Sequence, residues 1–288
     1  MKEEIKKYKF KEGLPIEFEI KNISDIYNFN KEILTKPHRA EFYQIIWIQK
    51  GSPIHYIDFK SIELKKNSIL FVPKDCVSFF DNSHDYDGKI FLFTDSFFGN
   101  DFNNVQFLQN TILYNNLYEI SLIKINEKVV ELFNVIEAMQ TELATLNDLA
   151  QPIILRNLLH NFLLLAERTK PIQGFKEIKL SANLDYLMLF KDLLEKNFRS
   201  NKSVSKYASD LSISEKRLNK ATSQILDKTP KQLIDERILL EAKRLLVHSN
   251  STIKEIAFIL GYEEPTNFIK YFRKHTQNTP SDFREQYL

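Results

Sequence analysis

The sequence predicts an α+β protein in which a strand-rich amino-terminal half is followed by helices and then by an all-helical carboxyl-terminal domain. Short apolar and aromatic runs separated by turn residues fill the stretch from residue 16 to residue 94. Apolar residues recur at helical spacing from residue 104 onward. After residue 203, one short sequence pattern occurs twice, offset by 49 to 50 positions. A chain of 288 residues has room for two domains.

The amino-terminal half contains a series of candidate strands. Turn sequences such as Lys50-Gly51-Ser52-Pro53 and Asp85-Tyr86-Asp87-Gly88 separate them. Many short, evenly spaced strands are typical of a small barrel or sandwich, so we expect a β-barrel at about 15–100. The candidate strands are 16–20, 42–49, 54–59, 68–72, 77–80 and 89–94.

Amphipathic helices are expected after the barrel, at about 104–168. Apolar residues form one stripe around Leu132 and another from Ile153 and Ile154 to Leu165, and a proline separates the two stripes. Such helices can pack on the barrel and on a partner subunit. The alternative is that they pack on the chain's own barrel alone.

The domain boundary is expected directly after these helices. The stretch Thr169-Lys170-Pro171-Ile172-Gln173-Gly174 has the composition of a linker. The predicted organisation is therefore a barrel-and-helix domain at 1–170, a linker at 171–182 and a helical domain at 183–288.

The repeated pattern has the physical features of a helix-turn-helix. In the second copy, Thr252 can cap a helix and Glu255 completes a capping box. Gly261 ends that helix, because glycine adopts a left-handed turn without steric cost. On the helix that follows, Phe268 and Phe272 face the core at i,i+4 spacing. A short helix, a turn and a polar, basic second helix are suited to the DNA major groove.

The first copy has the same order but departs from it at two positions. Ser212 stands at the place of the glycine, and Thr222 stands at the place of Phe272. Between the copies, a capped helix runs from Thr229 to near His248, and about 18 residues at ~1.5 Å rise span ~27 Å. That length suits two recognition helices one DNA turn (~34 Å) apart. Two matching copies therefore favour DNA binding over an ordinary helical domain with a solvated basic face.

With these residues in view, the segment from about 190 to 287 resembles the DNA-binding domain of AraC/XylS-type transcription regulators. The segments that carry the resemblance are Asp235-Glu236-Arg237-Ile238, Ala242-Lys243-Arg244-Leu245-Leu246, 253–262, 267–274 and 279–284. The departures are Ser212 and Thr222, together with Asp227 and Gln277, where the family usually has glycine.

The resemblance implies that the second helix of each copy enters the major groove. Asparagine can pair with an adenine edge and lysine with guanine, whereas phosphate contacts position the protein without specifying sequence. The candidate contacts to bases or nearby phosphates are Lys216, Asn219, Lys220, Thr266, Asn267 and Lys270, and the candidate phosphate contacts are Arg273 and Lys274.

The charge distribution agrees with DNA binding by the carboxyl-terminal domain. The net charge of the whole chain is only +2. Residues 176–288 contain 20 Lys and Arg against 15 Asp and Glu, whereas residues 1–175 contain 20 against 23. The basic excess thus lies with the helix-turn-helix copies.

The stretch at about 15–100 resembles the cupin-like sensor barrel that often precedes this DNA-binding domain. The resemblance lies in the order of Phe42-Tyr43-Gln44-Ile45-Ile46-Trp47, Gly51, His55-Tyr56-Ile57-Asp58-Phe59 and Phe71-Val72-Pro73. The interior of such a barrel is a natural small-molecule pocket, and a packed barrel without a ligand is the alternative. The candidate ligand-binding residues are His38, Arg39, Tyr43, Trp47 and Tyr56.

The barrel lacks the residue pattern of a metal enzyme. His38, His55 and His84 are single and scattered, so we predict no metal, no cofactor and no catalytic residues. The alternative function is a metal-dependent cupin-type enzyme with an appended DNA-binding domain. A DNA-repair alkyl acceptor would need reactive cysteines. The lone Cys76, on a predicted strand edge, does not fit that requirement and is expected to be a buried apolar residue. A single cysteine also excludes an internal disulfide.

The sequence therefore favours a sequence-specific transcription regulator, not an enzyme, with 1–170 as a sensor and dimerisation domain. The expected partners are double-stranded DNA with two adjacent major-groove half-sites, a small-molecule effector, a second copy of the chain in a homodimer, and RNA polymerase if the protein activates. The amino terminus has no apolar signal core and no run of 18 apolar residues exists, so no membrane contact is expected. We expect the protein in the bacterial cytoplasm, at the nucleoid.

Overall fold

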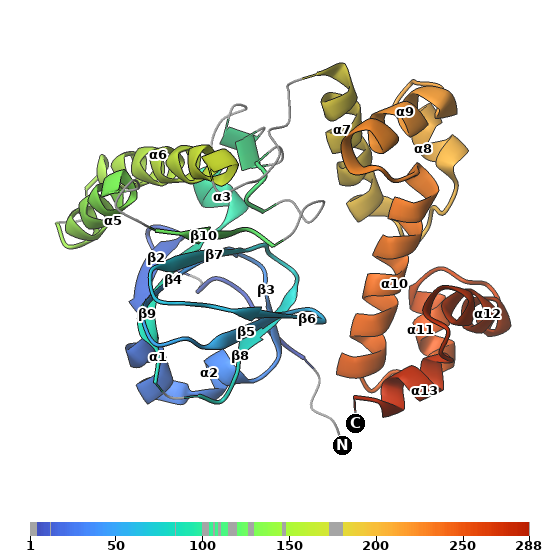
Figure 1. The fold of residues 1–288 in the computed structure, drawn as a ribbon, viewed down its shortest axis with the longest axis horizontal. Helices are drawn as coiled ribbons and strands as arrows, with labels where there is room; N and C mark the ends of the chain where they lie inside the picture. Colours follow the sequence, from blue (N-terminus) through green and yellow to red (C-terminus); the bar gives the residue numbers. More distant parts are fainter. Residues whose placement is uncertain are drawn as a thin grey trace. The chain divides into compact units, whose positions relative to one another are not determined.

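The computed structural model divides the chain into two compact units (Figure 1). The strand-rich unit comprises Lys6–Glu177, and the helical unit comprises Ile178–Leu288 together with Met1–Ile5. Residues 173–180 of the predicted linker lie outside the described residues, so the predicted domain bounds stay a prediction. The structure describes residues 5–11, 13–83, 85–99, 104–105, 107–108, 111–114, 120–125, 130–145, 148–172 and 181–287.

The strand-rich unit contains two five-stranded sheets. All strand pairs are antiparallel except β1 and β3, which are parallel. The first sheet has the order β1 (Lys6–Tyr8), β3 (His38–Ala40), β8 (Val77–Phe80), β5 (Ile54–Ile57) and β6 (Lys60–Glu63). The second has the order β10 (Leu122–Lys124), β7 (Ser68–Val72), β4 (Tyr43–Lys50), β9 (Asp87–Phe93) and β2 (Phe18–Asn22). The α+β class with a strand-rich first domain is confirmed.

An apolar core lies between the two sheets. Ile57 of β5 and Phe80 of β8 meet Ile46 of β4, Leu70 of β7 and Ile90 of β9 in one cluster of buried residues. Two short helices, α1 (Ile23–Asn30) and α2 (Glu32–Thr35), contribute Ile23 and Leu34 to the same cluster. The sheets therefore enclose an interior, as a barrel or sandwich requires.

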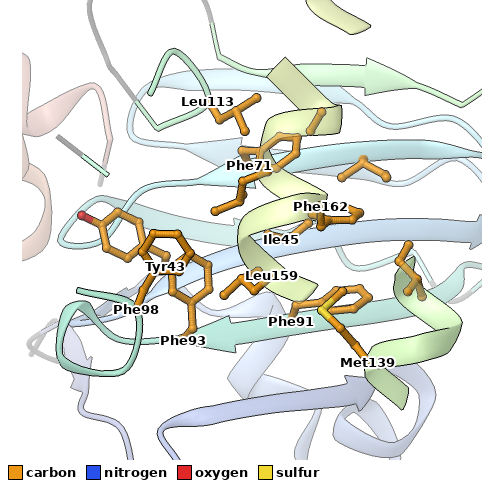
Figure 2. Packing of buried hydrophobic residues seen from close by; sticks show 14 of the residues in the cluster. Tyr43, Ile45, Phe71, Phe91, Phe93, Phe98, Leu113, Met139, Leu159 and Phe162 are labelled. Atoms are coloured by element: carbon orange, nitrogen blue, oxygen red, sulfur yellow. The ribbon is translucent and has the colours of Figure 1, made fainter. Parts of the chain in front are cut away.

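A second apolar core covers the other face of the second sheet (Figure 2). Ile45, Phe71 and Phe91 point from this sheet toward Met139 of α5 (Val130–Leu143) and Phe162 of α6 (Gln151–Ile172). A short helix, α3 (Asp95–Phe98), adds Phe97 and Phe98 to the same core. The expected packing of amphipathic helices on the chain's own barrel is confirmed.

The second predicted helical stripe needs one correction. Ile153 and Ile154 were expected on the packed face of α6, but their side chains are 55% and 40% exposed. Leu155, Leu159 and Phe162 form the packed face instead. The run of apolar residues at the start of α6 is longer than one helix face, so its members cannot all be buried against a single sheet.

The helical unit contains two helix-turn-helix segments joined by a long helix (Figure 1). Helix α8 contacts α9, and α11 contacts α12. The long helix α10 contacts both α9 and α11. Capping boxes start α10 at Thr229 and α11 at Thr252, as the sequence predicts for Thr252 and Glu255. The helices are α7 (Ala182–Asn197), α8 (Val204–Asp210), α9 (Glu215–Leu226), α10 (Pro230–His248), α11 (Ile253–Ile259), α12 (Pro265–Thr276) and α13 (Pro280–Glu285). Among the described residues, no helix has the length and apolarity to cross a membrane.

Candidate DNA-binding surface and barrel pocket

The first helix-turn-helix is formed by α8 and α9. Ser212, between the helices, adopts a left-handed backbone with φ of 55°, the conformation that glycine would take without cost. The Ser214 side chain caps α9 by accepting a hydrogen bond from the Arg217 backbone N–H at 3.2 Å. Leu218 and Thr222 are buried on the inner face of α9. Thr222 therefore takes a core position, as Phe272 does in the second copy.

The second helix-turn-helix is formed by α11 and α12, with a tight turn at Gly261. The φ of Gly261 is 72°, and a Cβ atom there would lie 1.8 Å from the carbonyl oxygen of Arg199. The Lys202 ammonium donates hydrogen bonds to the carbonyl oxygens of Gly261 at 2.9 Å and Arg199 at 3.1 Å. It also lies 4.6 Å from the centre of the Tyr262 ring, a cation–π distance. The turn is thus bound to the segment that precedes α8.

The outer faces of α9 and α12 present the predicted contact residues. Because Leu218 and Phe268 are buried at matching positions, the residues beside them on each helix face solvent. Every candidate contact is exposed: Lys216, Asn219, Lys220, Thr266, Asn267, Lys270, Arg273 and Lys274. The two surfaces are polar and basic and each is carried by one helix, which is the geometry that a major groove accepts.

A buried carboxylate joins α12 to the long helix α10. Asp235 of α10 accepts hydrogen bonds from the Tyr271 hydroxyl at 3.0 Å and the Lys231 ammonium at 2.9 Å. His275 Nε2 lies 4.0 Å from the same carboxylate. Burial and the nearby Asp235 charge raise the pKa of Tyr271, so its hydroxyl stays a donor. Sequence reasoning missed this cluster, although Tyr271 and His275 share one helix face at i,i+4.

A second buried carboxylate, Glu241, joins α10 to the segment that directly follows α7. Its oxygens lie 3.3 Å from Arg199, 3.3 Å from Arg237 and 3.4 Å from Arg244. The Arg237 guanidinium also stacks 3.9 Å from the centre of the Phe198 ring. These contacts fix the first recognition helix to the same long helix that holds the second, because α9 packs on α7 and α10.

The interior of the strand-rich unit contains a cavity of about 480 Å³. Interior-facing residues of both sheets line it, among them His38 of β3, His55 of β5 and Phe80 of β8. From the second sheet, Gln44 of β4 and Leu92 of β9 line it as well. This volume is in the range of small-molecule binding pockets.

Of the five predicted ligand-binding residues, only His38 lines this cavity, and the structure places the other four on the opposite faces of their strands. Tyr43 and Trp47 lie on the opposite face of β4, where Trp47 meets Phe133 of α5 at 5.2 Å between ring centres. Tyr56 stacks on Phe79 away from the interior, and Arg39 follows His38 on the opposite face of β3. The reason is the two-residue period of a strand, in which neighbours point to opposite faces.

His55 is the residue of the cavity that sequence reasoning passed over. Its side chain is 2% exposed, and neither ring nitrogen has a hydrogen-bond partner in the part of the chain that the structure describes. Burial, reinforced by the neighbouring His38, lowers the pKa of His55 to about 3, so the imidazole is uncharged at neutral pH. The two-residue period of β5 could have indicated this position, because it places His55 on the same face of the strand as the buried Ile57.

Comparison with known proteins identifies both units. Residues 30–159 match the AraC-like ligand binding domain, and residues 207–286 match a helix-turn-helix domain. The chain belongs to the AraC family of transcription regulators. Over 257 residues it is 23% identical to the HTH-type transcriptional activator RhaS of Escherichia coli K12, covering 86% of this chain and 87% of RhaS.

Solved structures are also similar to this AraC-family chain. Fatty-acid-bound ToxT from Vibrio cholerae is 16% identical, with coverage of 93% of this chain and 94% of ToxT and a TM-score of 0.41. An AraC-type DNA-binding domain-containing protein from Chromobacterium violaceum is 25% identical over 36% of this chain and 92% of its own, with a TM-score of 0.33.

The described part of this AraC-family chain contains no group of three His, Cys, Asp or Glu residues placed to hold a metal ion. His84 lies outside the described residues. Cys76 is buried, and its thiol donates to the carbonyl oxygen of Pro73 at 3.0 Å, so it packs as a small interior residue.

Proposed function

We propose that this AraC-family regulator binds two successive major grooves of one operator through α9 and α12, and responds to a small-molecule effector held in the barrel cavity. The observation that carries the DNA part is the matched exposure of polar and basic residues on both recognition helices. The helix α10 between them has 19 residues and therefore spans ~28 Å, close to one DNA turn of ~34 Å.

In this proposal α9 and α12 each contact the bases of one half-site. Lys216, Asn219 and Lys220 contact the first half-site. Thr266, Asn267 and Lys270 contact the second half-site. Asparagine pairs with adenine and lysine with guanine, which gives sequence preference. Arg273 and Lys274 in the last turn of α12 contact phosphates and fix the register of the protein on the duplex.

The effector part rests on the cavity between the sheets. Its walls are mostly apolar, and His38, Gln44 and His55 supply polar groups inside it. A mostly apolar pocket with a few polar groups is the usual form of a small-molecule site. The family is one of transcription regulators, and we propose that this chain acts by binding alone, without catalysis or a cofactor.

We further propose that the protein is a homodimer through the outer face of α6. Ile154, Asn157, Asn161 and Leu164 are exposed and follow one another at spacings of three and four residues. That spacing places them along one seam of the helix, as in a coiled coil, where buried asparagines set the pairing register. RNA polymerase becomes a further partner if the protein activates transcription.

The test is selection of bound sequences from a random DNA pool across a salt series. We expect two half-sites about ten base pairs apart. Lys270→Ala should then weaken binding to the selected site by ~1–3 kcal/mol and relax base preference in one half-site. Lys220→Ala should do the same in the other half-site.

Lys60→Ala is the matched control, because it removes the same charge from an exposed strand of the strand-rich unit. Binding by both recognition-helix variants at the strength of the Lys60 variant would remove these two residues from the interface. A single recovered half-site would show that α9 does not contact bases.

A further inference from the structure

The cavity of the strand-rich unit has a buried polar group in its lining for which the described residues supply no hydrogen-bond partner. His55 lies in the interior with both ring nitrogens unpartnered. The aromatic ring of Phe80 lies 4.4 Å from the imidazole centre and offers it no hydrogen bond in return. Buried polar groups in proteins nearly always have a hydrogen-bond partner. Two ring nitrogens without one, on a residue that lines a cavity, indicate that a ligand supplies the partner.

The buried end of the cavity is uncharged. The imidazole of His55 is neutral, for the reasons of burial given above. Burial also lowers the pKa of His38, whose Nδ1 donates to the carbonyl oxygen of Lys36 at 3.0 Å. The third polar residue, Gln44, carries a neutral amide. A charged ligand group placed here would lose its water without gaining an opposite charge.

The charged residues of the lining lie at the solvent side and include both signs. Glu19 and Lys21 of the edge strand β2 are paired with each other at 2.9 Å. Asp25 of α1 accepts a hydrogen bond from the Asn22 amide at 2.8 Å. Lys9 and Lys11, on the segment after β1, are exposed, so the rim carries three lysines and two carboxylates. The rim thus does not select strongly for one sign of charge.

The rest of the lining is apolar and partly open. Ile26, Ile33, Phe42, Ile90 and Leu92 contribute aliphatic and aromatic surface. Phe29, at the end of α1, lines the same cavity with 85% of its side chain exposed. An exposed phenylalanine at a cavity entrance is stabilised when an apolar molecule covers it.

We infer that the effector is an uncharged, largely apolar molecule whose hydroxyl or carboxamide group hydrogen-bonds to His55 at the buried end of the barrel. This inference rests on the proposed role of the cavity as the effector site. A neutral imidazole offers one donor and one acceptor, so a hydroxyl or an amide can pair with it in either tautomer. A carboxylate can only accept, and a sugar would leave many hydroxyls unpaired against the apolar walls.

Equilibrium dialysis of the full chain against four probes tests the inference. The probes are 4-butylphenol, 4-butylbenzoate, butylbenzene and glucose. We expect 4-butylphenol to bind about tenfold more tightly than butylbenzene or 4-butylbenzoate, the effect of one hydrogen bond to a buried group. The preference should not change between pH 6 and 8, because His55 stays neutral there.

Variants of one strand separate the role of the imidazole from that of folding. His55→Phe keeps an aromatic ring at this position but removes the hydrogen bond, so 4-butylphenol and butylbenzene should then bind alike. His55→Gln retains a donor and an acceptor and should keep most of the preference. Tyr56→Phe is the matched control, because this substitution removes a hydroxyl from the outer face of the same strand. It should not change the binding of any of the four probes.

The outcomes distinguish two failures. Tighter binding of 4-butylbenzoate or glucose than of 4-butylphenol would overturn the inferred effector class and leave the cavity as the effector site. Failure of all four probes to bind the folded chain would remove the cavity itself as an effector site. The ranking on the unmodified chain decides between these results even if His55→Phe does not fold.

Discussion

Replacing Gly261 with alanine should destabilise the helical unit severely. The left-handed backbone at φ of 72° costs an L-residue ~1–2 kcal/mol. In addition, the new Cβ would lie 1.8 Å from the Arg199 carbonyl oxygen, where real Cβ contacts are at least 3.0 Å, so the backbone must move. That movement breaks the hydrogen bonds of the Lys202 ammonium to both carbonyl oxygens, each worth ~1 kcal/mol or more. The total is ~3–5 kcal/mol, a large part of a typical domain stability of ~5–15 kcal/mol.

Urea unfolding of the full chain, followed by circular dichroism, measures this loss, and binding to the selected operator measures its effect on α12. The matched control is Ser212→Ala in the first copy. Ser212 already carries a Cβ at φ of 55°, so we expect a change within ~0.5 kcal/mol. A Gly261→Ala chain that unfolds within ~1 kcal/mol of the unmodified chain would show that the turn relaxes freely, and would refute the argument.

Two further predictions concern buried charge. Glu241→Ala should cost ~3–5 kcal/mol in urea unfolding, because it removes a buried carboxylate that pairs with both Arg237 and the buried Arg244. Glu236→Ala on the same helix removes an exposed pair with Lys228 and should cost under ~1 kcal/mol, and equal losses would contradict the assignment. The pKa of His55 is about 3 in the folded chain and ~6.5 in the unfolded chain, so between these values only the unfolded chain takes up the proton. The folded chain is therefore most stable above pH ~6.5, and the free energy of unfolding falls by ~1.4 kcal/mol per pH unit below it. His55→Gln should remove that part of the slope between pH 6.5 and 5.5, and an unchanged slope would mean that the imidazole is solvated.

The sequence predicted the helical unit more completely than the strand-rich unit, because its signals are local. The capping box of Thr252 and Glu255, the turn at Gly261 and the proline at the start of α12 each act within a few residues. The predicted departures from glycine are also explained. Asp227 and Gln277 both adopt left-handed backbone at helix ends, with φ of 55° and 63°. The chain keeps the geometry and accepts the steric cost.

The strands that sequence reasoning missed are short and depend on their neighbours. β1, β3 and β10 have three residues each and β6 has four. Segments of this length carry little periodic pattern, and their pairing partners are distant in sequence. The strands β7 and β8, whose residues are mostly buried, were predicted with their observed bounds.

The position of the predicted ligand residues away from the cavity has a different cause. From Tyr43 to Ile48 every residue of β4 is buried, because the interior core lies on one face and the α5 and α6 helices lie on the other. A strand buried on both faces shows no alternation of polar and apolar residues, so its sequence does not reveal which side chains face the cavity. The sequence predicted Tyr43 and Trp47 of this strand, whereas Gln44 of the same strand lines the cavity.

That double burial of β4 has a consequence for spectroscopy. A molecule that pushes on Gln44 cannot displace this strand into solvent, and close-packed interiors transmit such strain to the next layer. Trp47, the single tryptophan of the sequence, lies on the far face of the same strand against Phe133 of α5. Its fluorescence therefore reports, without any label, whether filling the cavity moves the helix layer.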